Sequence, residues 1–168
     1  MNKHTAADIS ASAPEGFVPI PIGGAFAALI GPLYGRWHEG RLQIGFRVGT
    51  KHANPGGSCH GGMLATMADI LISSAALYQA DIPRHFLPTI SLQFDFMANA
   101  PLRCWVQGQA DILRVTRNLL FSQGLVYADS ELALRASGVF RRGALQPDTE
   151  GDQWLQLPGM PPRPRHSA

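Results

Sequence analysis

The sequence predicts an α+β protein in which an antiparallel sheet wraps around one long central helix. Three observations carry this prediction: residues 60–80 form a long apolar stretch, Asp69 is its only charged residue from Gly61 through Ala80, and alternating hydrophobic runs precede and follow it. An uncharged helix needs protein on most of its sides, and the apolar face of a curved antiparallel sheet supplies that cover.

The elements before this helix are a short helix and a hairpin. The stretch "GAFAALIG" is typical of a helix that stops at Gly31-Pro32. In "LYGRWHEGRLQIGFRVG" two runs meet at Glu39-Gly40, and apolar residues occupy every second position from Leu42 to Val48. This alternation predicts a strand with one buried face, and the two runs together predict a hairpin.

Four further strands are expected after the helix. The runs are "TISLQFDFMAN", "LRCWVQGQADILRV", "LLFSQGLVYAD" and "LALRASGVFRR". Because they follow one another directly, we expect them to pair in succession as an antiparallel meander.

The length of 168 residues fits one domain. We expect this domain over residues 16–142, with a polar, flexible tail over 1–15 and a Pro/Gly-rich tail over 143–168. The second tail carries Trp154 and Leu157, which could hold it against the domain.

Charge and hydropathy exclude several classes of partner. A formal charge of +2 is too small to indicate nucleic-acid binding. No stretch reaches the roughly 18 unbroken apolar residues of a membrane span, and the N-terminus lacks the apolar region of a signal peptide. We therefore expect a cytoplasmic protein without a membrane partner, in which Cys59 and Cys104 are free thiols.

The stretch "NPGGSCHGGMLATMAD" leads into the long helix and carries the chemistry. A helix that starts at His60 or Gly61 leaves its first backbone N–H groups without internal partners, at the positive end of the helix dipole. With no Cβ at Gly61 and Gly62, a carbonyl oxygen can approach these amides. The alternative is that the glycines only form a turn and a close helix–sheet contact.

Asp69 is a candidate general base or nucleophile because a buried carboxylate among small apolar residues is costly without a role or a partner. The alternative is a solvent-facing or hydrogen-bonded aspartate. Nine residues separate His60 from Asp69, which means a rise of about 13–14 Å and a rotation of roughly 180° on an ideal helix. One chain cannot bring both to a single carbonyl, so the spacing predicts a two-fold dimer with two shared sites.

The pattern of Asn54, five residues, His60-Gly-Gly and then Asp69 resembles hotdog-fold acyl-CoA thioesterases of the phenylacetate-pathway and 4-hydroxybenzoyl-CoA thioesterase type, over about Phe17 to Arg142. The resemblance implies the hotdog fold and hydrolysis of an acyl-CoA thioester to a free acid and CoA. It further implies a homodimer that often pairs into a homotetramer, and no metal or bound cofactor.

The resemblance also assigns roles. Gly61 donates its N–H to the thioester carbonyl, next to Gly62; His60 and Asn54 shape that end of the site; and Asp69 is the nucleophile or the base that activates water. Thr89 in "PTISLQFDF" positions the water, with Ser91 as its competitor. Arg114 and Arg117 contact the CoA phosphates, although solvated turn charges explain them equally well.

The residues allow other interpretations of the chemistry. A Cys59–His nucleophile pair has no further support, and His52, His60 and His85 lack the short spacing of metal ligands. Met63, Met67 and Phe94 suit an aromatic or medium-length acyl group but are equally ordinary core residues. The alternatives to a thioesterase are an acyl-CoA-binding hotdog protein without turnover and a hydratase or dehydratase.

Overall fold

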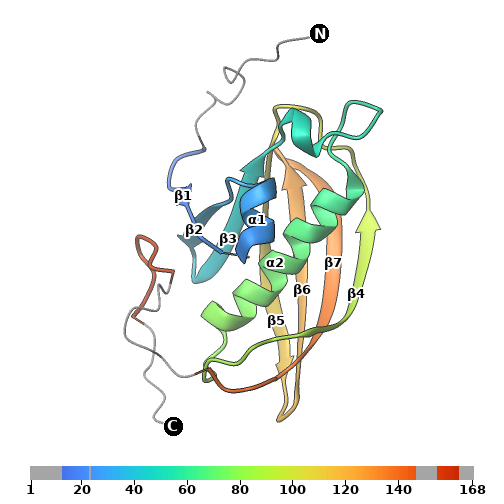
Figure 1. The fold of residues 1–168 in the computed structure, drawn as a ribbon. Helices are drawn as coiled ribbons and strands as arrows, with labels where there is room; N and C mark the ends of the chain where they lie inside the picture. Colours follow the sequence, from blue (N-terminus) through green and yellow to red (C-terminus); the bar gives the residue numbers. More distant parts are fainter. Residues whose placement is uncertain (1–12, 23, 147–154, 163–168) are drawn as a thin grey trace.

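The computed structural model describes residues 13–22, 24–146 and 155–162, and it shows one antiparallel sheet curled around a long helix (Figure 1). This confirms the predicted α+β architecture. The elements in chain order are β1 (Val18–Pro19), α1 (Gly24–Ile30), β2 (Tyr34–His38), β3 (Arg41–Arg47), the 3-10 turn η2 (Thr50–His52), α2 (Gly61–Gln79), β4 (Thr89–Phe96), β5 (Trp105–Val115), β6 (Leu119–Ala128) and β7 (Glu131–Arg141).

The strand order is β1-β2-β3-β5-β6-β7-β4. The expected meander of the last four strands is therefore wrong for β4, which pairs with β7 at the edge, Leu92 opposite Gly138. Its expected neighbour β5 pairs instead with β3, Phe46 opposite Val106. The reason is the path of the chain: α2 crosses the concave face and delivers β4 to the far edge, so the later strands fill the space between.

The core lies between α2 and the concave face of the sheet. Two glycines let the helix approach closely, because a Cβ at Gly108 would lie 2.6 Å from Leu71 Cδ2 and one at Gly124 would lie 3.3 Å from Ile72 Cγ1. By length and composition α2 could cross a membrane, and half of its apolar window is buried inside the molecule. The buried residues of α2 are Met63, Leu64, Met67, Ala68, Leu71, Ile72, Ser74, Ala75 and Ala76.

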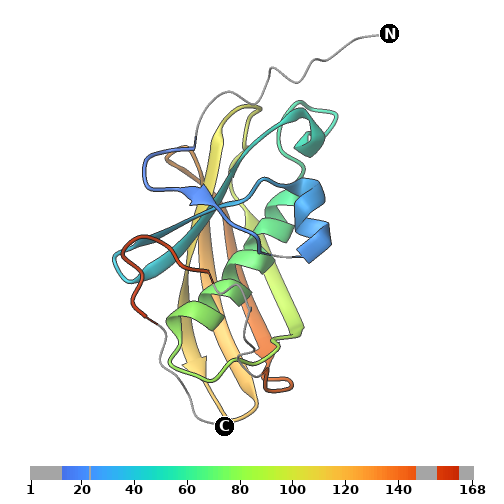
Figure 2. The same ribbon diagram turned by 60° about the vertical axis from the view of Figure 1, so that its left-hand side comes forward.

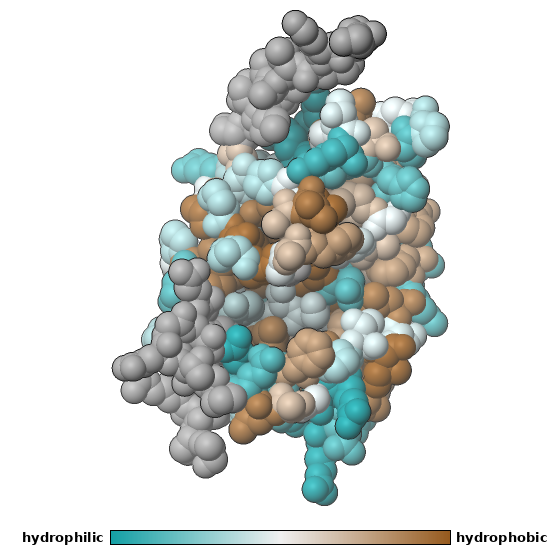
Figure 3. All heavy atoms as spheres, in the orientation of Figure 1, coloured by the Kyte–Doolittle hydropathy of each residue, from teal (hydrophilic) through white to brown (hydrophobic). Residues whose placement is uncertain are grey.

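A second stripe of α2 is only half buried. Ala65, Asp69, Ser73 and Leu77 follow one another at intervals of four residues and so lie on one face of the helix. The predicted cover of the helix is thus incomplete within one chain. Apolar surface gathers over α1 and on the side of the molecule where α2 and β4 lie (Figure 3).

Part of the C-terminal region packs against the domain. Leu155 and Leu157 are buried, and the Leu155 N–H donates a hydrogen bond to the Tyr78 hydroxyl at 3.3 Å. In Figure 2 this segment runs beside the β2–β3 hairpin, on the other side of the molecule from β4. The described part of the predicted tail is therefore attached to the body, while Trp154 lies outside the described residues.

Candidate functional site

The loop that leads into α2 is organised by Asn54. Its Oδ1 accepts hydrogen bonds from the backbone N–H groups of Gly56 at 2.8 Å and Ser58 at 3.3 Å, and its Nδ2 donates to Ser58 Oγ at 3.1 Å. This is the local side-chain-to-backbone bonding that makes asparagine a turn residue. Asn54 therefore shapes the loop, and its side-chain bonds are all made within it.

His60 caps the N-terminus of α2 and decides which backbone amide stays open. Its Nδ1 accepts the Gly62 N–H at 2.9 Å, and its carbonyl accepts the Met63 N–H at 2.9 Å. The Gly61 N–H meets no acceptor among the described residues. The first amide of the helix is thus available to an oxygen atom of a ligand, whereas the Gly62 N–H is already engaged.

Asp69 projects from the half-buried face of α2 and meets the first residue of β4. The Thr89 hydroxyl donates a hydrogen bond to Asp69 Oδ1 at 3.0 Å. Within the described residues, no other group donates to this carboxylate and no cation pairs with it. One carboxylate oxygen is therefore oriented by Thr89 while the other stays unengaged.

Ser91, the competitor of Thr89, lies elsewhere. Leu92 packs against the core, so alternation along β4 turns Ser91 to the opposite face of the sheet, and a register shift between Thr89 and Ser91 keeps Thr89 from following it. There Ser91 lines a cavity of about 200 Å³ together with Gln93 and Val139. The structure thus brings Thr89 and not Ser91 to Asp69.

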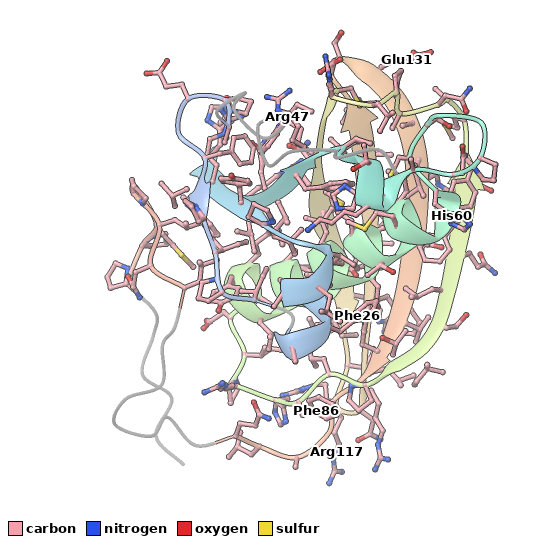
Figure 4. The ribbon with its side chains drawn as sticks, turned by 45° about the horizontal axis from the view of Figure 1, so that its top comes forward. Phe26, Arg47, His60, Phe86, Arg117 and Glu131 are labelled. Carbon is pink, nitrogen blue, oxygen red and sulfur yellow. The ribbon has the colours of Figure 1, made fainter. Side chains whose placement is uncertain are left out.

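Arg114 and Arg117 are exposed at the hairpin between β5 and β6. In Figure 4 Arg117 lies at the lower end of the molecule near Phe86, whereas His60 lies at the N-terminal end of α2. A single chain therefore does not bring these guanidinium groups to the oxyanion end of the helix.

Both cysteines are buried free thiols. Burial raises the pKa of Cys59 to about 12, and burial followed by the charge of Asp129 raises the pKa of Cys104 to about 11. Cys59 Sγ also donates to the His60 carbonyl oxygen at 3.7 Å. A thiol with this pKa is protonated at neutral pH and does not act as a nucleophile.

His52 and His85 hold backbone carbonyl groups. His85 Nδ1 lies 2.9 Å from the Gly143 carbonyl oxygen, and His52 Nε2 lies 2.7 Å from that of Ile30. Among the described residues, no group of three His, Cys, Asp or Glu side chains is placed to hold a metal ion. Sequence reasoning did not find the position of His52 near the site, because its Nε2 bonds to the Ile30 carbonyl, 22 residues earlier in the chain.

Comparisons with known proteins show the family of this chain. The model of the family "Thioesterase superfamily" matches residues 56–133. The chain is 30% identical over 128 residues to the Pseudomonas aeruginosa protein "Putative esterase PA0474", covering 76% of this chain and 95% of that one.

Solved structures share the fold. A mutant of the phenylacetic acid degradation protein PaaI from Thermus thermophilus superposes with a TM-score of 0.59 at 20% identity, over 70% of this chain and 97% of that one. The BH2602 protein from Bacillus halodurans, solved with CoA, superposes with a TM-score of 0.60 at 21% identity, over 67% and 74%. The chain has the hotdog fold and belongs to the thioesterase superfamily.

Proposed function

We propose that this protein hydrolyses an acyl-CoA thioester to a free acid and CoA, at two equivalent sites formed across a homodimer. Membership of the thioesterase superfamily supports thioester hydrolysis in general. The observation that carries the proposal is that α2 holds two functional groups at separate positions. The Gly61 N–H is open at the N-terminus of the helix, and the Asp69 carboxylate is oriented by Thr89 further along it.

The free edge of β4 supports the dimer. The other edge strand, β1, has two residues and one is a proline, whereas β4 has eight residues and, within the part of the chain that the structure describes, no neighbouring strand on one side. A long open edge with exposed Ile90 and Phe96 is a template for pairing with another strand. Antiparallel pairing with β4 of a second copy extends the sheet and lays the half-buried stripes of two α2 helices against each other.

In this dimer each half-site completes the other. The Gly61 N–H binds the thioester carbonyl oxygen and stabilises the charge that develops on it. The partner's Asp69 attacks the carbonyl carbon or removes a proton from the attacking water. The carbon–sulfur bond then breaks, and CoA leaves with the sulfur and takes up a proton. When water attacks, the acyl group leaves directly as the acid; when Asp69 attacks, the acyl group is first joined to its carboxylate as an anhydride, which a water molecule then hydrolyses to the acid.

The substrate class rests on several supports. The fold neighbour from Bacillus halodurans was solved with CoA. Arg114 and Arg117 are exposed cations of the kind that binds phosphates, and we assign them to the CoA phosphates in this proposal. We expect the protein in the cytoplasm. The acyl group lies in this proposal beside Phe94 and the apolar stripe of α2, and dimers associate further into a tetramer.

Two substitutions test the proposal. Asp69→Asn should abolish turnover while leaving the fold intact, since the amide can still accept from Thr89 but is neither base nor nucleophile. Gly61→Pro removes the proposed oxyanion donor, the Gly61 N–H. The first position of a helix tolerates proline, and the preceding residue, His60, has a ψ of 135°, which is the conformation that a residue before proline prefers. Gly61→Pro should lower kcat about 10²–10³-fold.

Gly61→Ala is the matched control for the proline. It keeps the N–H and adds a Cβ that lies 3.3 Å from the exposed Phe96 ring, as the proline also does. If Gly61→Ala is as slow as Gly61→Pro, the amide is not the donor. Saturable binding of an acyl-CoA panel by the wild type without release of CoA would identify a binding protein, and hydration of an enoyl-CoA would identify a hydratase.

A further inference from the structure

We propose that His52 is a positioning residue for the proposed thioesterase site, which holds the first amide of α2 in place. This inference rests on the proposed function. His52 is 5% exposed and is the last residue of η2, where it contacts three segments that are far apart in the sequence.

The hydrogen bonds of the ring determine its tautomer. His52 Nδ1 accepts the Gly49 N–H at 3.0 Å, so the proton must be on Nε2, which lies 2.7 Å from the Ile30 carbonyl oxygen. Burial lowers the pKa of His52, which agrees with this neutral form. Since Ile30 is the last residue of α1, the ring satisfies one of the carbonyls that a helix end leaves open.

The backbone of His52 continues this connection to the site. Its carbonyl oxygen accepts the His60 N–H at 2.7 Å, and the neighbouring bridge pairs Ala53 with Cys59. The His52 ring also packs edge-on against Phe46 of β3 at 5.1 Å between centroids. The residue before the open Gly61 amide is therefore attached to a backbone segment that the ring holds against both α1 and β3.

This connection matters for catalysis because an oxyanion donor acts only at a defined distance. A displacement of about 1 Å in a positioning element can cost roughly 10²-fold in rate. The sequence neighbour Lys51 provides the contrast: its Nζ donates to the carbonyls of Leu29 and Gly31, so it also holds the end of α1, but it has no bond to the α2 entrance.

Four variants of the full-length chain test the inference. His52→Leu removes both ring bonds, His52→Asn keeps an acceptor near Gly49, and His52→Gln keeps a donor near Ile30. Lys51→Met is the control that loosens the same end of α1. Acyl-CoA turnover and amide hydrogen exchange of the segment 59–64 are measured for each, well below the unfolding temperature.

We expect His52→Leu to lower kcat about 10²-fold with KM little changed, and to speed exchange in segment 59–64 about tenfold. His52→Asn and His52→Gln should fall between His52→Leu and the wild type, while Lys51→Met should match the wild type in both. If His52→Leu fails to fold, turnover and amide exchange of His52→Asn and His52→Gln test the inference instead.

The inference is overturned if the His52 variants keep wild-type exchange in segment 59–64, or if Lys51→Met changes it equally. A wild type that releases no CoA would instead refute the proposed function, and the exchange measurement would still decide on the positioning role.

Discussion

Mixing two inactive variants should restore activity if each site combines Gly61 of one protomer with Asp69 of the other. Eight residues separate them on α2, which corresponds to about 12 Å of rise. A carbonyl oxygen must lie about 3 Å from its donor, and the carboxylate must reach the adjacent carbon, so these two groups of one chain cannot serve one thioester.

The expected recovery follows from counting sites. When equal amounts of Gly61→Pro and Asp69→Asn exchange subunits at random, about half of the dimers are mixed, and each mixed dimer has one intact site of two. The mixture should therefore regain about 25% of wild-type kcat, against about 1% or less for either variant alone. The assay is CoA release before and after subunit exchange, with exchange followed by a tag on one variant.

The chain that carries both substitutions is the matched control. Mixed with an equal amount of wild type, it removes both sites from every mixed dimer, so activity should fall to about half of what the wild type gives alone. Failure to recover activity, with mixed dimers shown to have formed, would refute the shared site. A double variant that leaves the wild-type activity unchanged would refute it equally.

Four further outcomes are expected. Thr89→Val, which removes the 3.0 Å bond to Asp69, should lower kcat roughly tenfold, whereas Ser91→Ala on the other face should not change it, as steady-state kinetics would show. Ile90→Lys on the open edge of β4 should give monomers in sedimentation, whereas Leu29→Lys at the more exposed position on α1 should leave dimers. Cys59→Ala should retain kcat, because a thiol with a pKa of about 12 is not the nucleophile. His52, whose pKa is lowered from its ordinary 6.5 by burial, stabilises the fold in its neutral form; denaturant titrations from about pH 7.5 to about pH 5.5 should therefore show a stability loss that is larger in the wild type than in His52→Gln.

Elements defined by local patterns could be predicted from the sequence. The long helix, expected over 60–80, spans Gly61–Gln79, and the turn at Glu39-Gly40 joins β2 to β3. Both turn residues have positive φ, 50° and 76°, which is the backbone that the hairpin requires. Strand order could not be predicted in the same way, because pairing of β4 with β7 depends on the route of the chain across the sheet and not on its local sequence.

The candidate site also has local features, which the sequence predicts, and long-range contacts, which it does not. The spacing of His60 and Asp69 on one helix is local, and the structure has the two residues at separate positions of α2, while the two half-sites stay a prediction. The role of His52 could not be found this way, since its ring bonds to Ile30, 22 residues earlier, and its importance depends on the backbone bond to His60.

A single chain covers the α2 face with Asp69 only in part, and the proposed chemistry lies on that face. The stripe with Asp69 is half buried, and β4 beside it exposes Ile90 at 57% and Phe96 at 55%. An apolar open edge of this kind favours association in any case, so a copy that stayed monomeric would be both prone to aggregate and without a complete site. In the proposed dimer, turnover therefore depends on the pairing residues of β4 as well as on Gly61 and Asp69, and a substitution on β4 that weakens pairing should lower kcat in proportion to the dimers lost.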